Sequence, residues 1–197
     1  MRLVVGLGNP GRRYEATRHN VGFMAVEAFL SRHRRSPDRE ERGALVAEAR
    51  WSGETLLVVR PLSFMNLSGG PVGALARRGG LGAGDVVLLY DDSDLPMGAI
   101  RVRPGGSPAG HRGVESVTEA LGSSEIPRIR LGIGRPEGPH GALADFVLEE
   151  FEEGERELLG DMLARSVDAL QVLLKQGVKA AMNLYNQKPG PRDIARG

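Results

Sequence analysis

Apolar positions along the chain follow two alternating patterns. Short runs rich in Val, Leu and Ile predict buried strands, and apolar residues that recur every three or four positions predict helices that bury one face. The predicted strands are 2–7, 44–50, 54–60, 85–90, 100–103 and 128–134, and the predicted helices are 21–29, 68–78, 113–121, 155–176 and 178–186. Strands that alternate with helices predict an α/β fold with a twisted mixed sheet flanked by helices.

Turn and capping residues indicate where the predicted elements begin and end. Asn20 is a residue type that caps helix N-termini, and Gly79-Gly80 is typical of a helix C-terminus. The charged segment 31–42 shows neither pattern, so we expect a surface loop there. We find no internal repeat or interdomain linker, which predicts a single domain over residues 1–186. Residues 187–197 hold Pro, Gly and charges, and we expect them to be a disordered tail.

Composition excludes several kinds of site. The chain has 197 residues, of which 41% are hydrophobic, so there are enough apolar side chains to build a core. It has no cysteine, which excludes disulfides, zinc–thiolate sites and a thiol nucleophile. It has no run of the roughly 20 apolar residues that span a membrane, and its N-terminus lacks the layout of a signal peptide. We therefore expect a cytoplasmic protein without a membrane partner.

The net charge of +1 does not by itself indicate a nucleic-acid partner, but the charges are unevenly distributed. Acidic residues concentrate between positions 145 and 161, and arginines gather before them at Arg101, Arg103, Arg112, Arg128, Arg130 and Arg135. This separation predicts either one basic face, as a nucleic-acid partner would require, or an ordinary solvated surface. The first lysine is Lys175, so the Gly-Lys-Ser/Thr sequence of a phosphate-binding P-loop is absent.

A glycine-rich turn follows the first predicted strand. Its sequence from Gly6 to Gly11, Gly-Leu-Gly-Asn-Pro-Gly, matches the G-x-G-x-x-G pattern of dinucleotide-binding folds. Those folds begin a helix at the third glycine, whereas here a polar segment continues to His19. The acid that would bind a ribose is also missing from the end of a second strand. We interpret the motif as a structural turn and keep dinucleotide binding as an alternative.

Three polar side chains lie where α/β proteins place catalytic groups. His19 precedes the first predicted helix, and a histidine at such a corner can act as a general base near neutral pH. Asp91 follows the predicted strand 85–90, where a carboxylate can orient a histidine and stabilise its charged form. Asn66 follows strand 54–60 and carries an amide that can bind a peptide or an oxyanion, or can cap the next helix.

Other residue patterns bear on phosphate binding, serine chemistry and metals. Arg101 and Arg103 share one face of the predicted strand 100–103, a spacing that suits a phosphate clamp. Ser107 lies in a Gly-rich loop without the G-x-S-x-G sequence of a nucleophile elbow, which disfavours a serine hydrolase. No cluster of His, Asp and Glu with metal-ligand spacing accompanies Asp91, which disfavours a metal site.

Taken in order, the motifs resemble those of the bacterial peptidyl-tRNA hydrolases. They are Gly-Leu-Gly-Asn-Pro-Gly at 6–11, Tyr14, Thr-Arg-His-Asn-Val-Gly at 17–22, Phe-Met-Asn-x-Ser-Gly at 64–69, Asp-x-x-Asp-Leu-Pro-x-Gly at 91–98, Gly-Gly-Ser-x-x-Gly-His at 105–111 and Arg-x-Arg-x-Gly-Ile-Gly-Arg-Pro at 128–136. Each motif alone is a weak signal, whereas the ordered set extends from about Leu3 to Tyr185 and is highly specific.

The resemblance implies a monomeric esterase of one α/β domain that needs no metal or cofactor. Its implied substrate is peptidyl-tRNA, in which an ester joins a peptide to the 3′ ribose of tRNA, and its implied role is to recycle the tRNA. By resemblance, His19 is the base that activates water and Asp91 orients it. The residues implied to bind the peptide or the ester are Asn9, Tyr14, Met65 and Asn66. The residues implied to hold a tRNA phosphate are Arg103 and Arg130.

One position departs from the family. The family usually has Gly-His-Asn-Gly where this chain has Gly110-His111-Arg112-Gly113. The family's Asn helps to position substrate and water, whereas Arg112 accepts no hydrogen bond and adds a charge. We expect Arg112 to contact the substrate differently, by donating to the carbonyl or to the 3′ end of the tRNA. The departure keeps open a second hypothesis, a non-catalytic RNA-binding relative with the same fold.

Overall fold

The computed structural model describes residues 1–136 and 142–187, and its centre is an eight-stranded sheet with the order β2-β4-β5-β1-β6-β8-β7. β3 pairs with β4 outside this path. The pairs β5–β1, β1–β6 and β6–β8 are parallel, and the pairs towards both edges are antiparallel. The strands are β1 (Arg2–Gly6), β2 (Arg34–Arg35), β3 (Arg39–Glu41), β4 (Ala44–Trp51), β5 (Glu54–Pro61), β6 (Val86–Asp92), β7 (Ile100–Arg103) and β8 (Arg128–Gly132). The predicted mixed sheet is confirmed.

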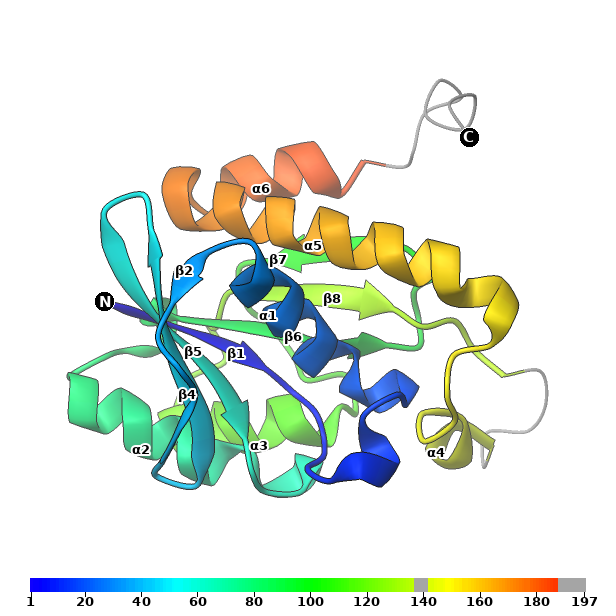
Figure 1. Cartoon of the computed structure of the whole chain (residues 1–197), viewed down its shortest axis with the longest axis horizontal. Coiled ribbons are helices and arrows are strands. Elements are labelled where there is room, and N and C mark those ends of the chain that lie inside the picture. Colours follow the sequence, from blue (N-terminus) through cyan, green and yellow to red (C-terminus); the bar gives the residue numbers. More distant parts are fainter. Residues whose placement is uncertain (137–141, 188–197) are drawn as a thin grey trace.

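Helices cover both faces of the sheet (Figure 1). On one face lie α1 (Val21–Ser31), α5 (Arg156–Gln176) and α6 (Val178–Tyr185), and on the other lie α2 (Gly69–Gly79) and α3 (Arg112–Leu121). A short helix, α4 (Ala142–Phe146), precedes α5. No helix within the ranges 1–136 and 142–187 is both long and apolar enough to cross a membrane.

Alternation along the central strands sends successive side chains into two cores. On β6, Val87 and Leu89 pack with α1 and α5, whereas Val86 and Leu88 pack with α2 and α3. The same alternation continues beyond these residues, so that Tyr90 belongs to the core on the α3 side. At the end of the strand it directs Asp91 to the α1 side, where His19 meets it.

The structure corrects some of the predicted elements. The segment 31–42 is not only a loop, because β2 and β3 pair there with β4. Their side chains are charged and mostly exposed, so no alternation of apolar residues marked them as strands. α4 was not predicted, since five residues are too few to show a helical period. Residues 188–197 of the predicted tail lie outside the described residues.

Two glycines let α1 contact the backbone of the sheet. A Cβ at Gly22 would lie 2.3 Å from the carbonyl oxygen of Leu89 and 2.5 Å from that of Leu7. A Cβ at Gly6 would lie 2.4 Å from the carbonyl oxygen of Gly22. Any larger residue at Gly22 would therefore push α1, and the turn that carries His19, away from the strands.

We expect Gly22→Ala to lower the free energy of unfolding by about 2–4 kcal/mol, because backbone atoms on both sides cannot yield. Gly160→Ala is the matched control, since Gly160 is exposed within α5 and no heavy atom of another segment lies near its would-be Cβ. That control should be neutral or stabilising by up to about 1 kcal/mol. Urea denaturation measures both, and equal midpoints would contradict the close-approach argument.

Candidate active site

A cleft of about 970 Å³ opens where β1 and β6 end, the edge at which α/β sheets place their sites. Its polar floor contains His19 and Asp91. The apolar side chains that line it come from two segments, and together we call them the apolar wall: Phe64, Met65, Leu143, Val147 and Leu148. The remaining lining is rich in arginine and includes the loop that ends at His111, and we call it the cationic wall.

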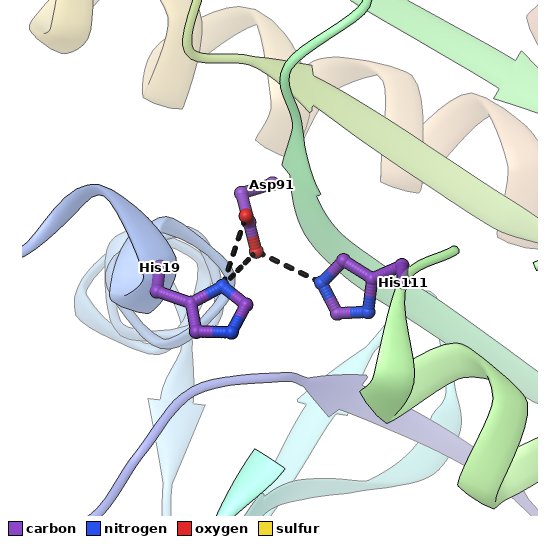
Figure 2. Close-up of side chains that lie close together, drawn as sticks. All are labelled: His19, Asp91 and His111. Carbon is purple, nitrogen blue, oxygen red and sulfur yellow. Dashed lines mark hydrogen bonds and ion pairs between the residues drawn. The ribbon is translucent and has the colours of Figure 1, made fainter. Parts of the chain in front are cut away.

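His19 and Asp91 form a close pair on the floor of the cleft (Figure 2). Nδ1 of His19 lies 2.9 Å from both carboxylate oxygens of Asp91. A carboxylate only accepts, so Nδ1 carries the proton and Nε2 is left with its lone pair. His19 lies in a 3-10 turn (Arg18–Asn20) just before α1, and Asp91 lies at the end of β6. The orientation of His19 by Asp91 that the sequence predicted is therefore present.

A second histidine binds the same carboxylate. Nε2 of His111 lies 2.9 Å from Oδ1 of Asp91, opposite His19 (Figure 2). His111 was not among the predicted site residues. Spacing along the sequence shows no His/Asp/Glu cluster around Asp91, but the fold brings His19, Asp91 and His111 together. The three residues are far apart in sequence, and only the Gly-His sequence at the start of α3 hinted at the third member.

His19, Asp91 and His111 place possible metal-ligand atoms within 4.8 Å of one another. The 2.9 Å separations, however, are hydrogen-bond distances, each with a ring N–H that donates to the carboxylate. We therefore interpret the three residues as a hydrogen-bonded triad. Such a triad supplies a general base without an ion.

The two histidines control the charge of Asp91. Burial alone would raise the pKa of Asp91, but its interactions with His111, followed by those with His19, hold that pKa far below its usual value, and each histidine hydrogen-bonds to the carboxylate. Asp91 therefore stays an anion throughout the neutral pH range. A permanent anion at Nδ1 is what a histidine base needs when it takes up a proton and becomes a cation.

The glycine-rich turn presents Asn9 to the cleft. Oδ1 of Asn9 accepts a hydrogen bond of 2.8 Å from the backbone N of Met65. The Nδ2 amide of Asn9 donates to none of the described residues and is left as the free donor. No helix begins at Gly11, where a dinucleotide-binding fold would have one; a single 3-10 turn (Arg12–Tyr14) follows it.

Asn20 holds this turn in place and does not cap α1, contrary to the prediction. Its side chain accepts a hydrogen bond of 2.8 Å from the backbone N of Asn9 and donates one of 3.0 Å to the backbone oxygen of Asn9. No hydrogen bond links this side chain to the first turn of α1. The capping preference of Asn misled the prediction because the buried Asn9 backbone competes for the same amide.

Arg18 ties the apolar wall to the turn that carries His19. Its buried guanidinium makes two hydrogen bonds to Glu155, of 2.9 and 2.7 Å, and lies over the rings of Phe146 and Phe151. The backbone N of His19 donates to the backbone oxygen of Val147, which lines the cleft. The segment after α4 is therefore fixed to the turn that carries His19 by main-chain and side-chain bonds.

The predicted binding residues are distributed unevenly around the cleft. Met65 and Asn66 line it, and Asn66 lies beside Arg112 at its rim. Tyr14 does not line the cleft; its ring stacks edge-on with Phe64, at 6.5 Å between centroids. Phe64 does line the cleft and is half-exposed, so it mediates any influence of Tyr14 on a bound molecule.

Five of the six clustered arginines line the cleft, and Arg101 is the exception. Three of them are already engaged. Arg130 pairs with Asp92 and Arg135 with Asp94, while the buried Arg128 donates to three backbone oxygens around the loop. Arg103 and Arg112 form no ion pair with the described residues. Within the part of the chain that the structure describes, the basic face predicted from the sequence therefore has two cations without an ion pair at the cleft.

Comparison with known proteins identifies the family. A family model described as "Peptidyl-tRNA hydrolase" matches residues 3–192. The chain belongs to the peptidyl-tRNA hydrolase family. A peptidyl-tRNA hydrolase from Syntrophomonas wolfei is 45% identical over 186 residues, which cover 94% of this chain and 100% of that protein. One from Symbiobacterium thermophilum is 43% identical and covers 94% and 98% of the two chains.

A solved peptidyl-tRNA hydrolase structure from Acinetobacter baumannii resembles the present structure with a TM-score of 0.89. The two chains are 27% identical, and the match covers 96% of this chain and 97% of that chain. The family resemblance and the fold predicted from the sequence are both confirmed. As a peptidyl-tRNA hydrolase family member, this chain keeps His19 and Asp91 together and presents Arg112 beside Asn66.

Proposed function

We propose that this protein hydrolyses the ester between peptide and tRNA in peptidyl-tRNA, and so recycles tRNA, using a water molecule that His19 deprotonates. The observation that carries the proposal is the His19–Asp91 pair, with its free Nε2, on the floor of a cleft that both apolar and cationic side chains line. Family membership favours this catalytic role over the non-catalytic alternative.

The reaction follows from the hydrogen bonds of the pair. Nε2 of His19 takes a proton from water as its oxygen attacks the ester carbonyl, and Asp91 stabilises the imidazolium that forms. The tetrahedral intermediate then collapses, the bond from carbonyl carbon to the 3′ oxygen breaks, and the imidazolium returns the proton to that oxygen. The products are the peptide acid and tRNA with a free 3′ hydroxyl. General base catalysis of this kind contributes about 10²–10⁴-fold.

Amide side chains supply recognition and charge stabilisation. We assign the free Nδ2 donor of Asn9, together with Asn66, to the peptide and to the oxygen of the attacked carbonyl. A neutral peptide amide offers a carbonyl oxygen to such donors, whereas the charged amine of aminoacyl-tRNA offers only further donors. The apolar wall, with Met65 and Phe64, would accommodate peptide side chains. Tyr14 would support this wall through Phe64.

The cationic wall would hold the tRNA. Arg103 and Arg112 are the stronger candidates for phosphate or 3′-end contacts because neither is paired with a described acidic residue. Arg130 is the weaker candidate as long as Asp92 compensates its charge. We further propose that residues 1–186 act as one catalytic domain and as a cytoplasmic monomer, since one chain supplies every group named above and peptidyl-tRNA arises in translation.

We expect Arg103→Ala to weaken tRNA binding and to reduce the slope of log K against log salt by about one, as the loss of one phosphate contact requires. Arg130→Ala should change the slope less, because Asp92 already balances that charge. Arg165→Ala, an exposed arginine of α5 outside the cleft, is the matched control. Filter binding between 50 and 200 mM salt, approximately the range where such slopes are resolved, would measure all three. An unchanged slope in Arg103→Ala would remove Arg103 from the tRNA site.

The direct test of the function is hydrolysis of N-acetyl-aminoacyl-tRNA beside free-amine aminoacyl-tRNA by the purified protein. We expect cleavage of the blocked substrate only. If the protein binds tRNA and cleaves neither, the non-catalytic alternative is favoured, and Arg112→Asn becomes the variant that tests whether this departure from the family removed activity.

A further inference from the structure

His111 makes one hydrogen bond through each nitrogen of its ring. Nε2 lies 2.9 Å from Oδ1 of Asp91, and Nδ1 lies 3.2 Å from the backbone N of Val114. A backbone N–H can only donate, so Nδ1 of His111 accepts this bond and carries no proton. His111 is thus the N-cap of α3. Because a backbone N–H of the helix donates to Nδ1, the proton of the neutral ring is on Nε2.

The cap also disfavours a charge on His111. The neutral ring has its proton on Nε2, where it donates to Asp91. A second proton on Nδ1 would oppose the N–H of Val114, break the cap and put a cation at the positive end of α3. Of the two rings that bind Asp91, therefore, only His19 is free to change its charge during the reaction.

We infer that His111 is a positioning residue for the hydrolysis proposed above. It is a neutral donor whose tautomer is imposed by α3. Its hydrogen bond fixes the Asp91 carboxylate and weakens the attraction between the negative charge of Asp91 and His19. The inference rests on the proposed roles of His19 and Asp91. It assigns His111 no contact with the substrate.

The groups around the two rings agree with a neutral His111. The ring of Tyr90 packs edge-on against His111 at 4.8 Å between centroids, and the ring of His19 lies at 5.4 Å. Arg112 is the next residue in the chain and brings a further positive charge. Besides Asp91, the charged residues that line the cleft include Asp92, Arg128 and Arg130, and Asp92 pairs with Arg130.

Two substitutions separate the two bonds of His111. Asn places an oxygen near the position of Nδ1, so His111→Asn keeps the cap and removes the donor to Asp91. Gln places an amide nitrogen near the position of Nε2, so His111→Gln keeps the donor and removes the cap. The pair therefore distinguishes an effect on His19 from an effect on the helix.

The pH dependence of kcat/KM for N-acetyl-aminoacyl-tRNA reads out the charge of His19 in the free enzyme, because only neutral His19 is a base. Without the donor, Asp91 holds the His19 imidazolium more strongly, so the midpoint in His111→Asn should rise by about half to one pH unit. In His111→Gln the midpoint should stay that of the wild type, while Tm falls by about 2–4 °C from the lost cap.

Nitrogen-15 NMR of the histidine rings tests the tautomer without using activity. The chain has four histidines, and the spectrum of His111→Gln assigns the signals of His111. We expect Nδ1 of His111 to be unprotonated, and Nε2 protonated, from pH 6 to pH 8, approximately the range in which a free histidine changes its charge.

Three results would overturn the inference. A protonated Nδ1 would show that His111 is a cation or the other tautomer. A midpoint raised equally by Gln and Asn would show that a charge on His111, rather than its neutral donor, acts on His19. A midpoint unchanged in both variants would leave His111 a helix cap only. A wild type without hydrolase activity would contradict the proposed function instead, while the NMR result would stand.

Discussion

Replacing His19 by alanine is expected to reduce kcat for N-acetyl-aminoacyl-tRNA by at least about 10²-fold and to leave tRNA binding unchanged. The imidazole is the group on the cleft floor with a free basic nitrogen, and alanine removes it without adding charge or bulk. tRNA contacts are assigned to the arginine-rich wall, which the substitution does not touch. Single-turnover hydrolysis measures the first quantity and filter binding the second.

The control for this prediction is His33→Ala. His33 stacks on Phe29 and binds Gln171 through Nε2, away from the cleft, so kcat should match that of the wild type. If His19→Ala kept most of its kcat, water would have to be activated by another group, and the assigned mechanism would be wrong. If it lost tRNA binding as well, the turn that carries His19 would belong to the tRNA site.

Asp91→Asn is expected to lower kcat by about 10²–10⁴-fold, although the side chain keeps its shape. His111 donates to Oδ1 of Asp91, so the oxygen of an asparagine would stay on that side and its NH₂ would face His19. His19 would then accept at Nδ1 and carry its proton on Nε2, the tautomer that cannot take a proton from water. The loss of the negative charge also destabilises the imidazolium.

Asp85→Asn is the matched control for this substitution, since Asp85 lies just before β6 at the opposite end from Asp91 and outside the cleft. Its kcat should equal that of the wild type. The pH profile adds a second readout, because any residual activity of Asp91→Asn should have its midpoint at lower pH, where a histidine without an anionic partner becomes protonated. A kcat within tenfold of the wild type would contradict the assigned role of Asp91.

Much of the architecture was predictable because its signals are local. The run Val86–Leu89 and the helical spacing in residues 156–176 each reflect burial of a strand or of a helix face, and both elements occur where the patterns placed them. The order of the strands was not predictable from these patterns, because parallel neighbours such as β1 and β6 are joined across many residues. β2 and β3 were not predicted because their charged residues show no alternation of buried and exposed positions.

The sequence by itself determined which residues could do the chemistry: a histidine at a strand-to-helix corner, an aspartate at a strand end, and amides in the turns between them. The tertiary structure decided how they act. His111 hydrogen-bonds to Asp91 on the side opposite His19, and Asn20 binds the backbone of Asn9 instead of capping a helix. Asp92 pairs with Arg130 and balances its positive charge. The physical reason is that residue type sets the number of donors, acceptors and charges, whereas their partners exist only once distant segments are packed together.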